Sequence, residues 1–154
     1  MFPNHRFRKS LILIGGSGEF GKLITARFAK PFMKRWNVFN IDSVANPDAT
    51  GNFVIENLHE FDEDSDIQGD HRVFNETMLK KLHAKLKEVA PEYDAIVNVA
   101  GSPRDKPLVS SLADGFELFE EYERVKRYEL YSSLLTANLA THHLSPDGYI
   151  LFKS

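Results

Sequence analysis

The sequence predicts an α/β domain with a doubly wound, Rossmann-like parallel sheet covered by helices on both faces. Three observations predict it. Short runs of branched apolar residues alternate with longer amphipathic segments. The apolar runs are continuous, as in strands buried on both faces. A glycine-rich turn joins the first run to the first amphipathic segment, and strands that alternate with helices form parallel sheets through right-handed crossovers.

The individual elements follow from local patterns. Continuous apolar runs predict strands at 9–14, 37–41, 52–56 and 94–100, and a fifth strand that begins at Tyr149. Apolar residues at helical spacing predict helices at 20–34, 73–89 and 115–143. Pro31 is expected to kink or end the first helix. Asp147 and Gly148 are expected to form a turn before the last strand.

Composition narrows the class of protein. The 154 residues fit a single domain, 1–154, and the 42% hydrophobic and 27% charged residues are ordinary for a soluble globular chain. The net charge of −3 argues against a nucleic-acid partner, because phosphate binding needs a basic face. Cysteine is absent, which excludes disulfides and thiolate chemistry. The apolar run 11–14 is too short for a membrane span, so we expect a cytoplasmic protein with no membrane partner.

The strongest functional signal is the turn LILIGGSGEFG at 11–21. Gly15, Gly18 and Gly21 have the spacing Gly-x-x-Gly-x-x-Gly between a strand and a helix. We expect Gly15 to turn the chain out of the strand, Gly18 to let the backbone approach phosphates, and Gly21 to bring the helix close to the strand. Unpartnered amides and the dipole at a helix start favour a pyrophosphate. The alternative is a tight turn that binds nothing.

An acidic residue strengthens this interpretation. Asp42 ends the second predicted strand, 21 residues after Gly21. A carboxylate there accepts hydrogen bonds from the adenosine ribose of a dinucleotide and repels a 2′-phosphate, which favours NADH over NADPH. Glu19 and Phe20 open the helix whose backbone amides would receive the diphosphate. As an alternative, Asp42 is a turn residue before Ser43.

Four stretches resemble the short-chain dehydrogenase/reductase family: the glycine turn, VFNID, DAIVNVAG at 94–101 and LATHHLSPDGYILF at 139–152. Within that family the sequence looks most like the dihydropteridine reductases, over about residues 10–153. The resemblance implies hydride transfer from NADH to a quinonoid dihydropterin, which regenerates tetrahydropterin. It also implies that Asn98, Ala100 and Gly101 lie beside the cofactor. Otherwise Asn98 is a polar residue satisfied by neighbouring backbone.

The sequence departs from the family at the catalytic residues. The family's Tyr-x-x-x-Lys, on the helix after the fifth strand, has no counterpart, so we expect the N-terminal, cofactor-binding part of that fold. Tyr122 and Lys126 have the right spacing and are neighbours on a helix, but they precede the fifth strand, and amphipathic helices produce such pairs by chance. His142 and His143 project in different directions, so no metal site is expected.

Two functions therefore stay open. One is an NADH-dependent reductase acting on a small molecule; the other is a non-catalytic dinucleotide-binding or dimerising scaffold derived from a short-chain reductase. The family resemblance implies a homodimer formed through the helix at 115–143. The open edge of the fifth strand also predicts self-association or marginal stability of the isolated chain.

Overall fold

The structure is a computed structural model, and it describes residues 8–29, 36–55, 76–101 and 115–153. Within 115–128 it describes the helix but not the side chains. The start of the helix predicted from 73 lies outside the described residues.

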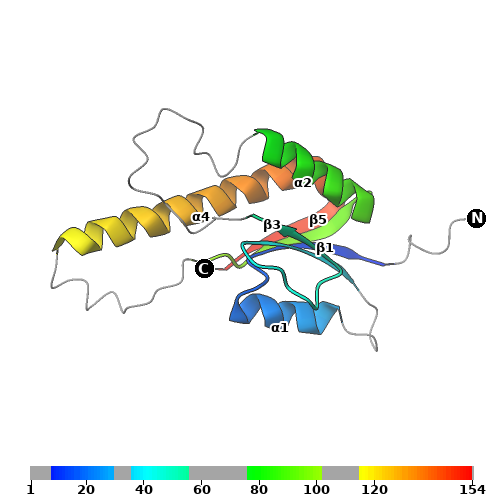
Figure 1. Cartoon of the computed structure of the whole chain (residues 1–154). Coiled ribbons are helices and arrows are strands. Elements are labelled where there is room, and N and C mark those ends of the chain that lie inside the picture. The colour runs from blue at the N-terminus through cyan, green and yellow to red at the C-terminus, as the bar shows by residue number, and fades with distance from the viewer. Residues whose placement is uncertain (1–7, 30–35, 56–75, 102–114, 154) are drawn as a thin grey trace, which may run out of the picture.

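A five-stranded parallel sheet forms the centre of the fold (Figure 1). Its strands are β1 (Ser10–Ile14), β2 (Asn37–Asp42), β3 (Gly51–Val54), β4 (Tyr93–Asn98) and β5 (Leu144–Phe152). They lie in the order β3-β2-β1-β4-β5, which confirms the predicted doubly wound sheet. The strand order reverses between β1 and β4, and such sheets bind ligands at the carboxyl ends of the strands beside that point.

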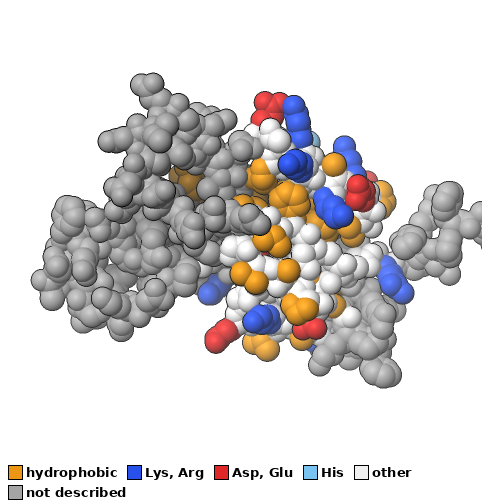
Figure 2. Space-filling view, in the orientation of Figure 1, with side chains coloured by type: hydrophobic (Ala, Val, Ile, Leu, Met, Phe, Trp, Pro, Cys, Tyr) orange, Lys and Arg blue, Asp and Glu red, His pale blue; other side chains and the backbone are white. Residues whose placement is uncertain are grey.

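Helices cover both faces of the sheet. Helix α1 (Glu19–Phe28) lies on one face, and α2 (Glu76–Val89) and α4 (Gly115–His143) lie on the other (Figure 1). Strand β1 is buried along its whole length. On the face shown in Figure 2, the described surface mixes hydrophobic side chains with charged side chains of both signs.

The sheet separates two hydrophobic cores. Ile12 and Ile14 pack in the larger core, toward α2 and α4, with Leu82, Leu86 and Leu139. Leu11 and Leu13 pack in the smaller core toward α1, with Val38, Ala95, Ile24 and Phe28. Each fully buried Leu or Ile contributes roughly 1.5–3 kcal/mol. This two-sided burial is why the sequence of β1 is a continuous apolar run rather than an alternating one.

The last strand differs from the prediction. Strand β5 begins at Leu144, directly after α4, and not at Tyr149. The predicted turn at Asp147 and Gly148 lies inside the strand as an irregularity, because Tyr93 pairs with Leu144 and Ala95 pairs with Tyr149. Turn residues mark a bulge as readily as a strand boundary, and only the pairing with β4 distinguishes the two.

Among the described residues, no helix is both long enough and apolar enough to cross a membrane.

Three histidines lie where α2 meets the end of α4. His83 Nδ1 is 2.6 Å from His143 Nε2, and His83 Nε2 is 3.0 Å from Asn138 Oδ1. The Asn138 oxygen can only accept, so His83 Nε2 carries a proton and its Nδ1 accepts from His143 Nε2–H. His142 lies beside His83, with 4.8 Å between the ring centroids. These hydrogen bonds therefore require that the rings of His83 and His143 are neutral.

Burial, together with the nearby His83, His142 and Lys87, lowers the pKa of His143 to about 4. Burial likewise lowers the pKa of His83. Tyr93, which packs edge-on against His143, donates its hydroxyl to the Leu86 carbonyl at 2.9 Å, and burial raises the pKa of this phenol. Among the described residues, no carboxylate stabilises a proton on either histidine.

We expect acid to destabilise the fold through this cluster. An unfolded histidine binds its proton with a pKa of 6.5, whereas folded His143 does so at about 4. Stabilisation by the neutral ring is therefore complete above pH 6.5 and is lost as pH falls toward 4, by roughly 2–3 kcal/mol. Urea unfolding across this range measures the loss. His143→Leu should show a shallower dependence, and equal slopes for the two proteins would contradict the role of His143.

Candidate functional site

The glycine loop follows β1 and leads into α1. Gly15 has a φ of +84°, and a Cβ there would lie 2.6 Å from the Cα of Ala100. A Cβ on Gly21 would lie 2.4 Å from the carbonyl oxygen of Gly15. Both positions therefore require glycine: Gly15 for its left-handed backbone, and Gly21 so that α1 packs directly on the loop.

Gly18 is different, because the fold does not require it. It caps α1 with a φ of −69°, which any residue adopts, and no side chain caps the helix. A Cβ on Gly18 would have an ordinary contact of 3.7 Å with the Gly15 oxygen. Among the described residues, no packing contact requires a glycine here. The helix N-terminus therefore leaves room beside its backbone amides.

A pocket of about 610 Å³ opens at the carboxyl ends of β1, β2 and β4. Its walls are the glycine loop, the segment 42–48 that ends β2, and the residues 99–101 that follow β4. Lys22 of α1 adds a basic side chain to the lining. Five of the predicted site residues meet here: Gly15, Gly18, Asp42, Ala100 and Gly101.

Asp42 links β2 to the glycine loop. It is only 7% exposed, and its Oδ2 accepts a hydrogen bond of 2.9 Å from the backbone N–H of Ser17. Its Oδ1 accepts from the backbone N–H of Ser43 at 2.7 Å and from the Ser43 hydroxyl at 3.3 Å. A carboxylate has about four acceptor positions, so it keeps capacity for a hydroxyl of a ligand in the pocket.

The side chain of Asn98 does not line the pocket. Its Nδ2 donates to Ser132 Oγ and Thr136 Oγ1 of α4, at 3.3 and 3.1 Å. Its Oδ1 accepts from the backbone N–H of Ala100 at 3.0 Å. Asn98 thus fixes the chain at Ala100, which does line the pocket. A direct contact between Asn98 and a cofactor stays a prediction.

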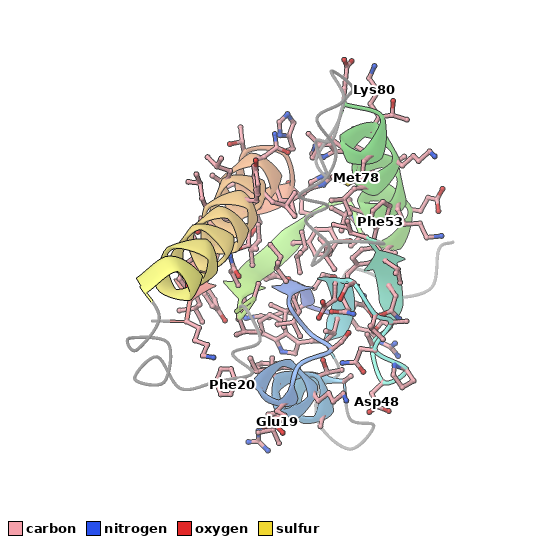
Figure 3. All side chains as sticks on the ribbon, turned by 60° about the vertical axis from the view of Figure 1, so that its left-hand side comes forward. Glu19, Phe20, Asp48, Phe53, Met78 and Lys80 are labelled. Atoms are coloured by element: carbon pink, nitrogen blue, oxygen red, sulfur yellow. The ribbon has the colours of Figure 1, made fainter. Side chains whose placement is uncertain are left out.

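The Glu19 side chain points outward from α1, away from the sheet, whereas the Phe20 side chain lies to one side of α1 (Figure 3). Phe20 lines a separate apolar groove of about 440 Å³, which runs between α1 and the strands β4 and β5 and includes Trp36, Tyr149 and Leu151. Any contribution of Glu19 and Phe20 to the first pocket therefore comes from their backbone amides. Their place in a cofactor site stays a prediction.

Ser17 and Asn46 are among the residues of the pocket wall that sequence reasoning missed. The Ser17 hydroxyl donates to the carbonyl of Val44 and accepts from Asn40 Nδ2 at 3.3 Å. The Asn46 side chain donates to the carbonyl of Gly16 at 2.8 Å. Their sequence signal was weak, because polar residues in a glycine loop and in a turn are usually explained by solvent and by local turn geometry.

The structure does not support the Tyr122–Lys126 pair or a metal site as alternatives. Tyr122 and Lys126 belong to α4, but their side chains lie outside the described part of the chain. No group of three or more His, Cys, Asp or Glu residues in the described ranges is arranged to hold a metal ion.

No family model matches the sequence, and no curated protein matches it. Solved structures that share the fold include three short-chain dehydrogenases. A short-chain dehydrogenase family protein from Francisella tularensis matches at 16% identity and a TM-score of 0.55, over 96% of this chain and 51% of its own. A short-chain dehydrogenase from Oenococcus oeni matches at 17% identity and a TM-score of 0.54, over 94% of this chain and 60% of its own. A short-chain dehydrogenase/reductase from Saccharomyces cerevisiae matches at 16% identity and a TM-score of 0.58, over 95% of this chain and 53% of its own.

This chain has the fold of the short-chain dehydrogenases. It spans between about half and three fifths of the length of the three solved chains. At this level of identity the likeness establishes the fold, and the function is argued from the site.

The glycines give a matched pair of substitutions. In Gly21→Ala the new Cβ meets backbone atoms at 2.4–2.7 Å, which cannot move cheaply, so we expect a loss of stability of at least about 2 kcal/mol. In Gly18→Ala the contact is ordinary, and the reduced entropy of the unfolded chain offsets the poorer helix cap, so the change should stay within about 1 kcal/mol. Urea unfolding measures both, and equal losses would contradict this account of the loop.

Proposed function

We propose that the chain is a nicotinamide-dinucleotide-binding domain of the short-chain dehydrogenase/reductase type, and that it binds NADH. One observation carries the proposal. Gly18, which the fold does not require, opens onto the same pocket as the buried carboxylate of Asp42. A diphosphate beside the bare N-terminus of α1 and a ribose at Asp42 would use both features.

The residues of the pocket fit the parts of such a cofactor. Backbone amides at the start of α1, from Gly18 onward, would bind the diphosphate, with Lys22 adding positive charge. The remaining acceptor position of Asp42 would hold an adenosine ribose hydroxyl. Ala100 and Gly101 would flank the nicotinamide side. When bound, the cofactor supplies a hydride for reduction.

The preference for NADH rests on charge. A 2′-phosphate at Asp42 would place two anions together in a pocket that also contains Asp48. NADH offers hydroxyls instead, and Asp42 is an acceptor for these. NADPH would therefore bind more weakly.

We predict that NADH binds at least about tenfold more tightly than NADPH, and that Asp42→Asn weakens NADH binding by about tenfold or more, the usual effect of losing a hydrogen bond to a charged group. The difference in affinity between NADH and NADPH should be smaller in the same variant. Isothermal titration with both cofactors measures this. Asp48→Asn is the matched control, because it makes the same charge change in the pocket wall at an exposed residue.

A wild-type chain that binds neither cofactor would overturn the proposal. An equal loss of NADH affinity in Asp42→Asn and Asp48→Asn would contradict a specific ribose contact at Asp42.

The reaction is a further part of the proposal. The resemblance of the stretch 139–152 to dihydropteridine reductases makes a quinonoid dihydropterin the substrate to assay first, with NADH as the hydride donor. The non-catalytic dinucleotide-binding scaffold uses the same pocket. NADH oxidation that depends on the pterin distinguishes the enzyme from the scaffold.

We also propose a homodimer formed through α4. Leu130 and Leu134, one helical turn apart, are 51% and 57% exposed. Ser132, Leu135 and Leu139 of the same helix are buried. The exposed leucines therefore form an apolar stripe that a second copy can cover.

In sedimentation experiments we expect the wild type to be dimeric and the double variant Leu130→Glu/Leu134→Glu to be monomeric, because the added carboxylates would be buried unpaired at the contact. Leu23→Glu makes the same change on α1 at a residue that is 67% exposed, and it should leave the dimer intact. A monomeric wild type, or a dimer that survives the double variant, would contradict the proposal.

A further inference from the structure

The peptide group that joins Gly16 and Ser17 is held at both ends by side chains. The Gly16 carbonyl accepts a hydrogen bond of 2.8 Å from Asn46 Nδ2. The N–H of the same peptide, on Ser17, donates to Asp42 Oδ2 at 2.9 Å. In a trans peptide these two groups point in opposite directions, and the described chain has no cis peptide. Asn46 and Asp42 therefore hold this peptide from opposite sides.

Asn46 is itself fixed by a full set of partners. It is 1% exposed, its Nδ2 also donates to Thr25 Oγ1 at 3.0 Å, and its Oδ1 accepts from the N–H of Asp48 at 3.0 Å. Asn52, on β3, holds its backbone, because Asn52 Oδ1 accepts from the Asn46 N–H at 2.7 Å and Asn52 Nδ2 donates to the Asn46 carbonyl at 2.9 Å. The side chain that holds the glycine loop is thus anchored to the sheet.

The space beside this peptide is also closed. A Cβ on Gly16 would lie 2.2 Å from Asn40 Oδ1, a buried oxygen with no hydrogen-bond partner among the described residues. Asn40 cannot turn its amide over, because its Nδ2 donates to Asn52 Oδ1 at 2.9 Å. Rotation of the peptide would therefore cost its two hydrogen bonds and meet close neighbours. The peptide has one orientation, in which its N–H faces Asp42.

We propose that Asn46 is a positioning residue for nucleotide recognition in this pocket, which rests on the proposed function. By holding the Gly16 carbonyl, Asn46 keeps the Ser17 N–H on Asp42 Oδ2. That bond, with the bonds from Ser43 to Oδ1, fixes the direction of the carboxylate. Asn46 thus sets which acceptor position of Asp42 remains for a ribose, although it acts through a peptide and not through the ribose itself.

Two variants test this role in the full chain. Asn46→Asp keeps the shape of the side chain but replaces the Nδ2 donor with an oxygen that faces the Gly16 oxygen. Asn46→Ser keeps a turn bond to the backbone of residue 48 but is too short to reach Gly16. Asn37→Asp is the matched control, since Asn37 begins β2 at the other end of the strand from Asp42 and does not line the pocket.

The readouts separate positioning from a general loss of structure. We expect both Asn46 variants to weaken NADH binding about tenfold while NADPH binding changes less than about threefold, because only ribose recognition at Asp42 is lost. In nuclear magnetic resonance spectra, the Ser17 amide proton should move upfield and exchange with solvent at least about tenfold faster. Asn37→Asp should leave the cofactor preference and the Ser17 amide unchanged.

The outcomes distinguish the two proposals. If the wild type binds neither cofactor, the proposed function fails, and the role of Asn46 fails with it. If the wild type prefers NADH and both Asn46 variants keep the same preference and an unchanged Ser17 amide, only the role of Asn46 fails. If neither variant folds, Asn46 is a structural residue and the positioning role is overturned.

Discussion

Close backbone contact at the end of β1 is the constraint on which the rest of the structure depends. Gly15 turns the chain with a left-handed φ directly against the backbone of Ala100, and Gly21 brings α1 onto the carbonyl of Gly15. Side chains at either position would separate β1, α1 and the end of β4. The absence of two Cβ atoms therefore places the N-terminus of a helix, the end of β2 and the end of β4 around one pocket.

The contact has an electrostatic consequence. Helix α1 starts without a side-chain cap, so its first amides keep their partial positive charge toward the pocket. Beside them lies a carboxylate, Asp42, that the loop itself holds through Ser17. Positive and negative partners thus lie at fixed separation in one cavity. The proposed dinucleotide has both an anionic group and hydroxyls, which is the reason that we propose it rather than a simple anion.

A single peptide group in the glycine loop contacts both Asp42 and the loop after β2. Gly16 and Ser17 share a peptide group whose oxygen and hydrogen are bound by Asn46 and Asp42, and the Asn46 side chain also reaches Thr25 of α1. The loop after β2 therefore supports the glycine loop as well as lining the pocket. Beside this peptide, the buried acceptor Asn40 Oδ1 has no partner in the part of the chain that the structure describes. An unpaired buried carbonyl costs about 1–3 kcal/mol, and such a cost is typical of a functional site.

The sequence by itself determined the layered fold, the glycine loop and the place of Asp42, because these depend on local pattern: apolar runs, helical spacing and a strand–turn–helix order. Tertiary structure alone decided where polar side chains bind. Asn98 and Asn46 are both amides beside glycine-containing segments, yet Asn98 binds Ser132 and Thr136 of α4 while Asn46 binds Gly16, 30 residues earlier in the chain. Hydrogen-bond partners far apart in sequence leave no periodic signal, so side-chain direction becomes known only when the elements are packed together.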